Sequence, residues 1–179
     1  MVNKIDYYTE KLRSLDDWDS YLQKESGLPG PRGNLELAQA FADLGNEEKI
    51  QSYISIEQEK APVNSARMFL TFCGVVGLGT LINEGKMQYL SRLRRFASDS
   101  RWRIREAVAM ALQRIGDADI EVLLEETAKW SKGNLYEKRA AIAALCEPRL
   151  LISEKVAAST LDILDQVTTA FAKSENRRS

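Results

Sequence analysis

Residues 99–117 read D-S-R-W-R-I-R-E-A-V-A-M-A-L-Q-R-I-G-D, and this stretch decides the fold class of the chain. At about 100° per residue, five apolar side chains fall within roughly 80° of Ile104 on a helical wheel. They are Ala107, Val108, Ala111, Leu112 and Ile115. The pattern predicts an amphipathic helix with one buried face. Arg101, Arg103, Arg105 and Arg114 flank this apolar stripe.

Both ends of this predicted helix carry residues typical of helix termini. Asp99 or Ser100 can cap the start, because a short side-chain oxygen accepts a free amide of the first turn. Gly116 is expected to end the helix in the left-handed conformation. Trp102 falls about 160° from the core stripe, so we expect it on the outer face.

The whole chain of 179 residues repeats this helical pattern, with 44% hydrophobic residues, four prolines and ten glycines. Most segments place apolar residues every three or four positions, so we predict an all-α chain without strands. We expect one domain over residues 1–179. It consists of an N-terminal helical cap (1–26, with Ser14 capping its second helix), a Pro/Gly loop (27–33) and stacked helix pairs (34–179).

Two segments outside the opening stretch carry specific expectations. The loop G-L-P-G-P-R-G at 27–33 is either a connector or a binding loop with Arg32 at its tip, and Asn34 caps the helix that follows. Residues 65–83 are the most apolar stretch, which we interpret as a buried central helix rather than a membrane span. Its glycines at 74, 77 and 79 are tolerated where a neighbouring backbone comes very close.

The net charge of −1 hides an uneven distribution. Residues 1–60 hold seven basic and twelve acidic residues, a net charge of −5, whereas residues 86–115 hold eight basic and two acidic residues, a net charge of +6. This asymmetry either steers an anionic partner toward the basic segment or lets one part of the array dock on another.

The amino-acid composition argues against the common types of catalytic site. Without histidine, serine triads, cysteine–histidine pairs and histidine metal sites are excluded. The carboxylates show no spacing typical of a metal loop, so we expect neither metal nor cofactor. Cys73 and Cys146 lie inside apolar helical patterns, which predicts reduced core thiols. The N-terminus shows no secretory signal, and we expect a cytoplasmic protein that does not bind a membrane.

The opening stretch resembles the inner helix of a HEAT repeat. The resemblance rests on Asp99, Ile104, Arg105, Ala107, Ala111, Leu112, Ile115, Gly116 and Asp117. The run R-E-A-V-A at 105–109 recurs as R-A-A-I-A at 139–143, an offset of 34 residues that falls in the range of stacked helical units. The resemblance implies a right-handed α-solenoid of stacked antiparallel helix pairs. In such a solenoid, a row of polar side chains, the polar ladder, would connect neighbouring repeats. Arg105 would belong to this ladder together with Asp99 or Asp117.

A second resemblance is to bacterial HEAT-like proteins of the DNA alkylation repair class. The segment Y-E-K-R-A-A-I at 136–142 is similar to an aromatic-x-x-R-A-A-[IV] run of that class. It implies that DNA would lie on a concave basic face. The chain departs from the class where the chemistry would sit, because the central repeats lack a tryptophan–aspartate cluster and Trp18-Asp19 lies in the N-terminal cap. Base excision is therefore not predicted.

Two functions remain open from the sequence. The first is a noncatalytic binding or scaffold module for a protein partner or a second copy of the chain. The second is a protein that binds the backbone of double-stranded DNA. We expect Arg101 and Arg103 to be freer for contact than Arg105, which has the structural role in the ladder. The candidate contact residues are Arg67, Arg92, Arg94, Arg95, Arg101, Trp102, Arg103, Arg105 and Arg139.

Overall fold

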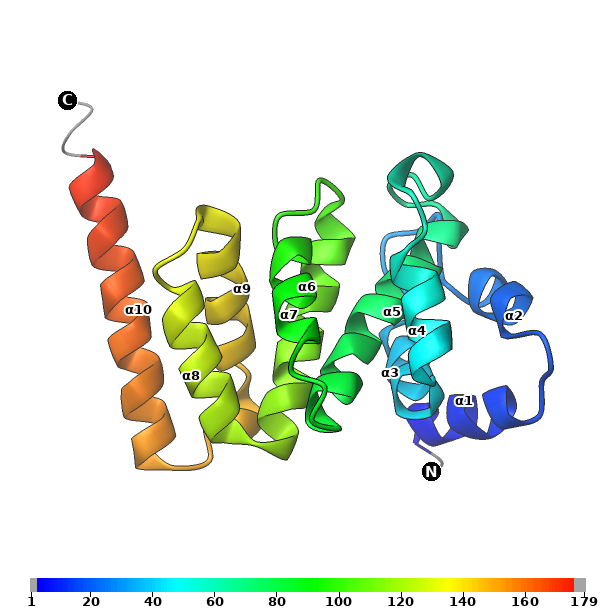
Figure 1. Ribbon diagram of the computed structural model, residues 1–179, viewed down its shortest axis with the longest axis horizontal. Helices are drawn as coiled ribbons and strands as arrows, with labels where there is room; N and C mark the ends of the chain where they lie inside the picture. Colours follow the sequence, from blue (N-terminus) through cyan, green and yellow to red (C-terminus); the bar gives the residue numbers. More distant parts are fainter. Residues whose placement is uncertain (1–2, 176–179) are drawn as a thin grey trace. The chain divides into compact units, whose positions relative to one another are not determined.

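A computed structural model describes residues 3–175, and over this range it contains ten α-helices, two short 3-10 helices and no strand (Figure 1). The all-α prediction is confirmed. The α-helices are α1 (Lys4–Arg13), α2 (Trp18–Lys24), α3 (Leu35–Leu44), α4 (Glu47–Ile54), α5 (Ala66–Asn83), α6 (Tyr89–Phe96), α7 (Trp102–Ala118), α8 (Ile120–Trp130), α9 (Leu135–Leu145) and α10 (Glu154–Glu175). The 3-10 helices are η1 (Gln58–Lys60) and η2 (Pro148–Leu150).

The chain divides into two compact units, and the division falls inside α7. The first unit ends at Ala111 and the second begins at Leu112. Each unit has its own buried core. The single stacked array expected from the sequence stays a prediction.

Helix α5 is the centre of the first unit. It packs against α2, α3, α4 and α6, while α1 packs against α3. Nearly every side chain from Met68 to Ile82 is buried, which confirms the expected buried central helix. By length and composition α5 could also cross a membrane, but 78% of it is buried inside the protein.

Glycines let two neighbouring segments approach α5 closely, as predicted. A Cβ atom on Gly79 would lie 2.6 Å from the carbonyl oxygen of Ala111 on α7. A Cβ on Gly74 would lie 2.9 Å from the Cβ of Tyr53 and 3.1 Å from the backbone nitrogen of Ile54, both on α4. Because backbone atoms cannot move aside as a flexible side chain can, larger residues at these positions would separate the helices.

Most of the described α-helices are preceded by a short polar residue whose side chain accepts a backbone amide of the first turn. Asn34 caps α3, with its side chain accepting from the amide of Leu37, and Ser65 caps α5 in the same way through Met68. The prediction that Ser14 caps the second helix is wrong. Ser14 ends α1, and Asp17 caps α2 because its carboxylate accepts from the amide of Ser20.

Helix α7 confirms the predicted apolar stripe but not the predicted end. Ile104, Ala107, Val108, Ala111, Leu112 and Ile115 are all buried. Gly116 lies inside the helix, which continues to Ala118, and its φ is not positive. A Cβ on Gly116 would lie 2.6 Å from Leu123 and 3.1 Å from Leu150, so this glycine serves close packing rather than termination.

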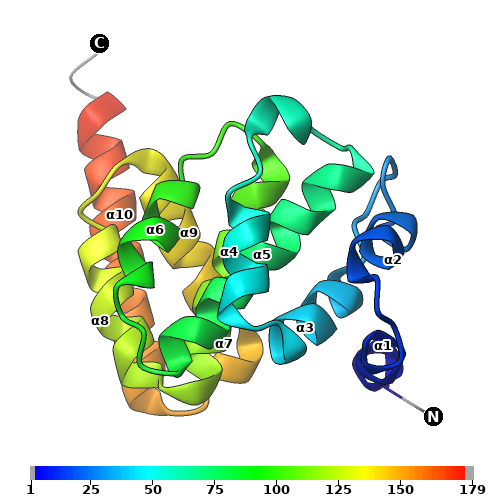
Figure 2. The same cartoon turned by 45° about the vertical axis from the view of Figure 1, so that its right-hand side comes forward.

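In the second unit, α8 pairs with α9, and α10 packs against both (Figure 2). The core includes Trp130, Leu145 and Val167. Asp117 accepts from the Nε and one terminal nitrogen of Arg149, at 2.9 and 3.1 Å, and this pair ties the end of α7 to η2. Cys73 and Cys146 are both free thiols, but the expectation of two core thiols is wrong for Cys146, which is exposed after the end of α9.

Candidate functional site

The arginines at the beginning of α7 are internal structural groups. The guanidinium of Arg101 pairs with both carboxylate oxygens of Asp99, at 2.9 and 2.8 Å, and donates to the carbonyl oxygen of Ala61 at 3.2 Å. Asp99 also accepts from the backbone amide of Arg101 at 2.8 Å. The Arg101 side chain is only 3% exposed. The forked pair orients Arg101, and its hydrogen bond to Ala61 connects the start of α7 to the segment that precedes α5.

Arg103 binds the same segment before α5 and, in addition, the 27–33 loop. Its Nε donates to Oδ1 of Asn64 at 2.7 Å, and a terminal nitrogen donates to the carbonyl oxygens of Gly30 at 2.8 Å and Pro31 at 3.3 Å. The guanidinium carbon lies 4.3 Å from the ring centroid of Trp102. Because Arg103 holds carbonyl groups of the 27–33 loop, this loop is anchored through its backbone.

The expectation that Arg101 and Arg103 are freer for contact than Arg105 is therefore wrong. Both are buried, at 3% and 7% exposure, and their donors are used by the protein itself. Arg105 is less buried and donates to the carbonyl oxygens of Asp99 at 2.7 Å and Ser100 at 3.1 Å. Trp102 is 43% exposed, as the helical wheel predicted.

A groove of about 560 Å³ lies beside α6 in the first unit. Its walls come from the end of α4, from α6 and from the turn before α7. The lining residues are Ile54, Gln88, Tyr89, Ser91, Arg92, Arg95, Phe96 and Asp99. The groove thus combines two arginines with the apolar groups Ile54 and Phe96. The sequence predicted Arg92 and Arg95 as contact residues but gave no sign of the apolar wall that α4 adds.

The charge of this groove is positive after internal pairing. Asp99 is the carboxylate in its lining, and Arg101 occupies both of its oxygens. Arg92 donates to the hydroxyl of Ser55 at 3.2 Å. Within residues 3–175, Arg95 has neither an ion pair nor a hydrogen bond through its side chain, and it is exposed. In the described part of the chain, two cationic side chains therefore face the groove without a carboxylate partner.

The other candidate arginines lie outside this groove. Arg67 is exposed in the first turn of α5 and, in the described part of the chain, also lacks an ion-pair partner. Arg94 and Arg139 already interact with other groups of the protein. Arg139 belongs to α9 in the second unit. The structure thus brings Arg92 and Arg95 together and leaves the remaining candidates elsewhere.

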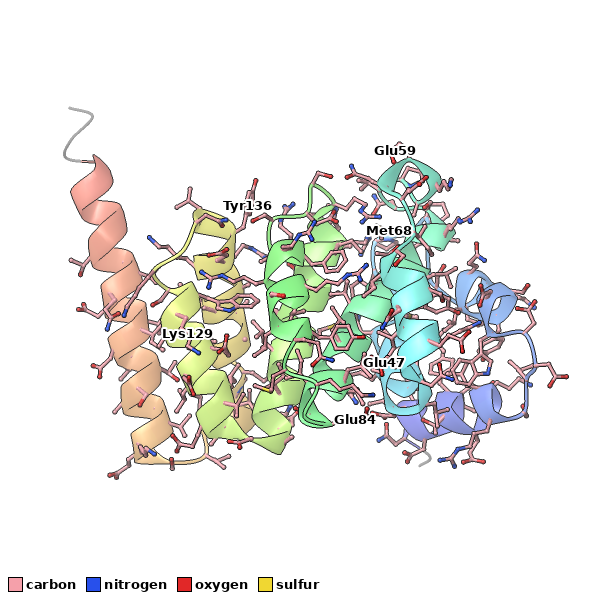
Figure 3. All side chains as sticks on the ribbon, viewed as in Figure 1. Glu47, Glu59, Met68, Glu84, Lys129 and Tyr136 are labelled. Carbon is pink, nitrogen blue, oxygen red and sulfur yellow. The ribbon has the colours of Figure 1, made fainter. Side chains whose placement is uncertain are left out.

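A polar network positions the start of α6. The hydroxyl of Tyr89 donates to Glu47 on α4 at 2.5 Å and accepts from Gln51, and Lys86 pairs with Glu47 at 3.0 Å. Lys86 also pairs with Glu84, and both carboxylates are labelled in Figure 3. The hydrogen bond from Tyr89, followed by that from Lys86, lowers the pKa of Glu47 below its ordinary value. The same bond raises the pKa of Tyr89, since it favours the neutral phenol.

A second polar cluster lies in the N-terminal part of the first unit and is structural. Asp19 accepts from the phenol of Tyr53 and from the ammonium of Lys49, each at 2.6 Å. Burial, then the bond to Asp19, raises the pKa of Tyr53 far above its ordinary value, so the phenol stays neutral. Among residues 3–175, no group of three or more cysteines and carboxylates is placed to hold a metal ion.

Comparison of the chain with protein-family models, with curated proteins and with solved structures found no match.

Proposed function

We propose that this chain is a noncatalytic HEAT-like helical-repeat module that binds a protein partner in the cytoplasm. The observation that carries the proposal is the groove beside α6, where Arg92 and Arg95 lie next to Ile54 and Phe96. Interfaces between proteins combine apolar contacts with arginine in this way. The carboxylate in this groove, Asp99, is held by Arg101 and is not placed as a general base.

The repeat assignment is supported by features that recur along the chain. Arg67, Arg105 and Arg139 all lie in the first two turns of their helices, α5, α7 and α9. Ala107 and Ala141, separated by the 34-residue offset, are both fully buried. In Figure 1, α4, α5 and α6 are joined at alternating ends, as α8, α9 and α10 are within the second unit. Successive antiparallel helices of this kind are the building blocks of a solenoid.

Affinity capture followed by reconstitution tests the proposed function. Proteins that copurify with the tagged chain would be identified, purified and mixed with it, and the mixture analysed by size-exclusion chromatography. We expect a complex of fixed stoichiometry at physiological salt. If none of the captured proteins forms such a complex, the protein-binding proposal fails. The chain run alone across a range of concentrations would report self-association as the alternative.

A second candidate function is binding to the backbone of double-stranded DNA, favoured by the net charge of +6 over residues 86–115. Arg101 and Arg103 use their donors in internal contacts, whereas Arg92 and Arg95 of the same segment are half-exposed and exposed, and Arg67 is exposed elsewhere in the first unit. Gel-shift titrations with duplex DNA at two salt concentrations test this function. Binding that falls steeply with salt would support it, because neutralised phosphates release counterions. No binding at low salt would exclude it.

A further inference from the structure

We propose that the groove beside α6 binds an acidic segment of the partner protein. The carboxylates of that segment pair with Arg92 and Arg95, and an apolar side chain of the same segment packs against Ile54 and Phe96. This inference rests on the proposed protein-binding function and adds the chemistry of the partner and the place where it docks.

Helix α6 is strongly basic. The helix reads Y-L-S-R-L-R-R-F, with three arginines and no acidic residue. Arg92 and Arg95 are three positions apart on a helix, so their Cβ atoms are neighbours at about 5–6 Å and both reach the same groove. Guanidinium groups present a planar fork of donors that fits carboxylates in pairs. Two neighbouring guanidinium groups therefore fit a segment that carries two nearby acidic residues.

The guanidinium groups of Arg92 and Arg95 are available to a ligand. Asp99, the carboxylate nearest to them in the groove lining, is already neutralised by Arg101. Arg92 donates to the neutral hydroxyl of an exposed serine, Ser55, and this bond exchanges readily for a carboxylate. Arg95 has no partner to lose within the described residues. Binding an acidic segment therefore breaks no internal ion pair of Arg92 or Arg95.

The apolar wall favours a peptide over a nucleic acid. Phe96 lines the groove beside the arginines and is partly exposed there, and Ile54, which is 5% exposed, adds a small accessible area to this wall. A DNA backbone offers phosphates but no apolar side chain to cover this wall, whereas a peptide offers both groups within a few residues. The groove volume of about 560 Å³ also suits a few side chains rather than a duplex.

Selection from a phage-displayed library of random peptides tests the proposal. The wild-type protein would be the bait, and fluorescence anisotropy with synthetic copies of the selected peptides would give affinities. We expect selected sequences to carry paired aspartate or glutamate next to leucine, isoleucine or phenylalanine. Arg95→Glu should weaken their binding by about tenfold, and the Arg92→Glu/Arg95→Glu double variant should abolish it.

Arg67→Glu is the matched control, because Arg67 is an exposed arginine of the same unit outside the groove. It should leave peptide affinity unchanged. Replacing the acidic residues of the peptide by lysine should restore binding to Arg95→Glu and not to the wild type. Circular dichroism melting curves would verify that each variant folds.

Three outcomes would overturn the groove assignment: no enrichment of acidic residues, equal binding to the double variant, or an equal loss with Arg67→Glu. The last result would indicate diffuse electrostatic attraction of the kind that DNA exploits. The protein-binding function is judged separately by reconstitution. A partner that binds the wild type and the double variant equally would support the protein-binding function and refute only the groove as the binding site.

Discussion

Arginines at the end of α6 and at the start of α7 lie close in sequence but serve opposite purposes. Arg92 and Arg95 stand beside a groove, where one donates to a serine hydroxyl and the other has no partner in the described chain. Arg101 and Arg103 are buried and donate to carboxylate, carbonyl and amide oxygens of earlier loops. The first pair is available to a ligand, and the second pair holds the first unit together.

The difference shows that local charge density does not identify a binding surface. Residues 86–115 carry a net charge of +6. Much of that charge fixes two loops around the start of α7, the 27–33 loop at Gly30 and the 61–65 loop at Ala61 and Asn64. An arginine can be buried here because its Nε and at least one terminal nitrogen donate to oxygens, which offsets the cost of removing the cation from water.

Replacing Arg101 by methionine should have the largest effect. The substitution keeps much of the side-chain volume but leaves the largely buried carboxylate of Asp99 without its cation. We expect a loss of about 4 kcal/mol in the free energy of unfolding, measured by urea titration. The Asp99→Asn/Arg101→Met double variant should lose less than the sum of the two single changes. Strict additivity would show that the pair contributes no coupling energy.

Arg103→Met should cost less, about 2 kcal/mol, because the lost partners are neutral oxygens rather than a carboxylate. Arg103→Lys should recover only part of this loss, since lysine cannot donate to Asn64 and Gly30 in a fork. Hydrogen exchange should show faster opening of the 27–33 loop in the methionine variant. Unchanged protection of that loop would contradict the anchoring role of Arg103.

The sequence predicted the elements well and their long-range partners poorly. Local signals sufficed for the helices, for the cap at Asn34 and for the close approach at Gly79, because each depends on residues near in the chain or on the lack of a side chain. The backbone carbonyl oxygens of Ala61 and Gly30, which accept from Arg101 and Arg103, belong to residues 40 and 73 positions earlier. The sequence around Arg101 and Arg103 does not indicate these distant oxygens.

One signal for Arg101 was present in the opening stretch. On the helical wheel Arg101 falls about 60° from Ile104, inside the span of the apolar stripe. An arginine at this position must find internal oxygens, and Asp99 two residues earlier was the obvious candidate. The prediction that Gly116 ends the helix was wrong. Glycine is common at helix ends, but here the side chains of Leu123 and Leu150 require the missing Cβ inside the helix.

Tyr89→Phe should have a smaller effect that depends on pH. The hydrogen bond from Tyr89 and the ion pair with Lys86 lower the folded-state pKa of Glu47 below its ordinary value of 4.5. A lowered folded-state pKa contributes stability that is present above pH 4.5 and is lost as pH falls through the folded value. The variant should therefore be less stable than the wild type at neutral pH, and the difference should shrink in acid. Urea titrations across pH would measure it.

A constant difference between these two proteins at all pH values would show that the Tyr89 hydroxyl acts independently of Glu47. Glu47→Gln is the matched control, because it keeps the shape of the side chain and removes its titration. Tyr89→Phe in that background should show no pH dependence between pH 3 and 6, about the range in which a glutamate titrates. This result would assign the effect to Glu47 rather than to another carboxylate.

We expect the smallest change in the free energy of unfolding at Arg95, one of the two arginines beside the groove. Arg95→Ala removes a cation that has no partner within residues 3–175, so the free energy of unfolding should change by less than about 0.5 kcal/mol. Arg92→Ala loses one hydrogen bond to the exposed Ser55 and should cost little more. A loss at Arg95 comparable to that at Arg101 would mean that α6 also depends on its arginines for folding. Retained stability would instead show that these charges are dispensable to the fold, as side chains serving a ligand are.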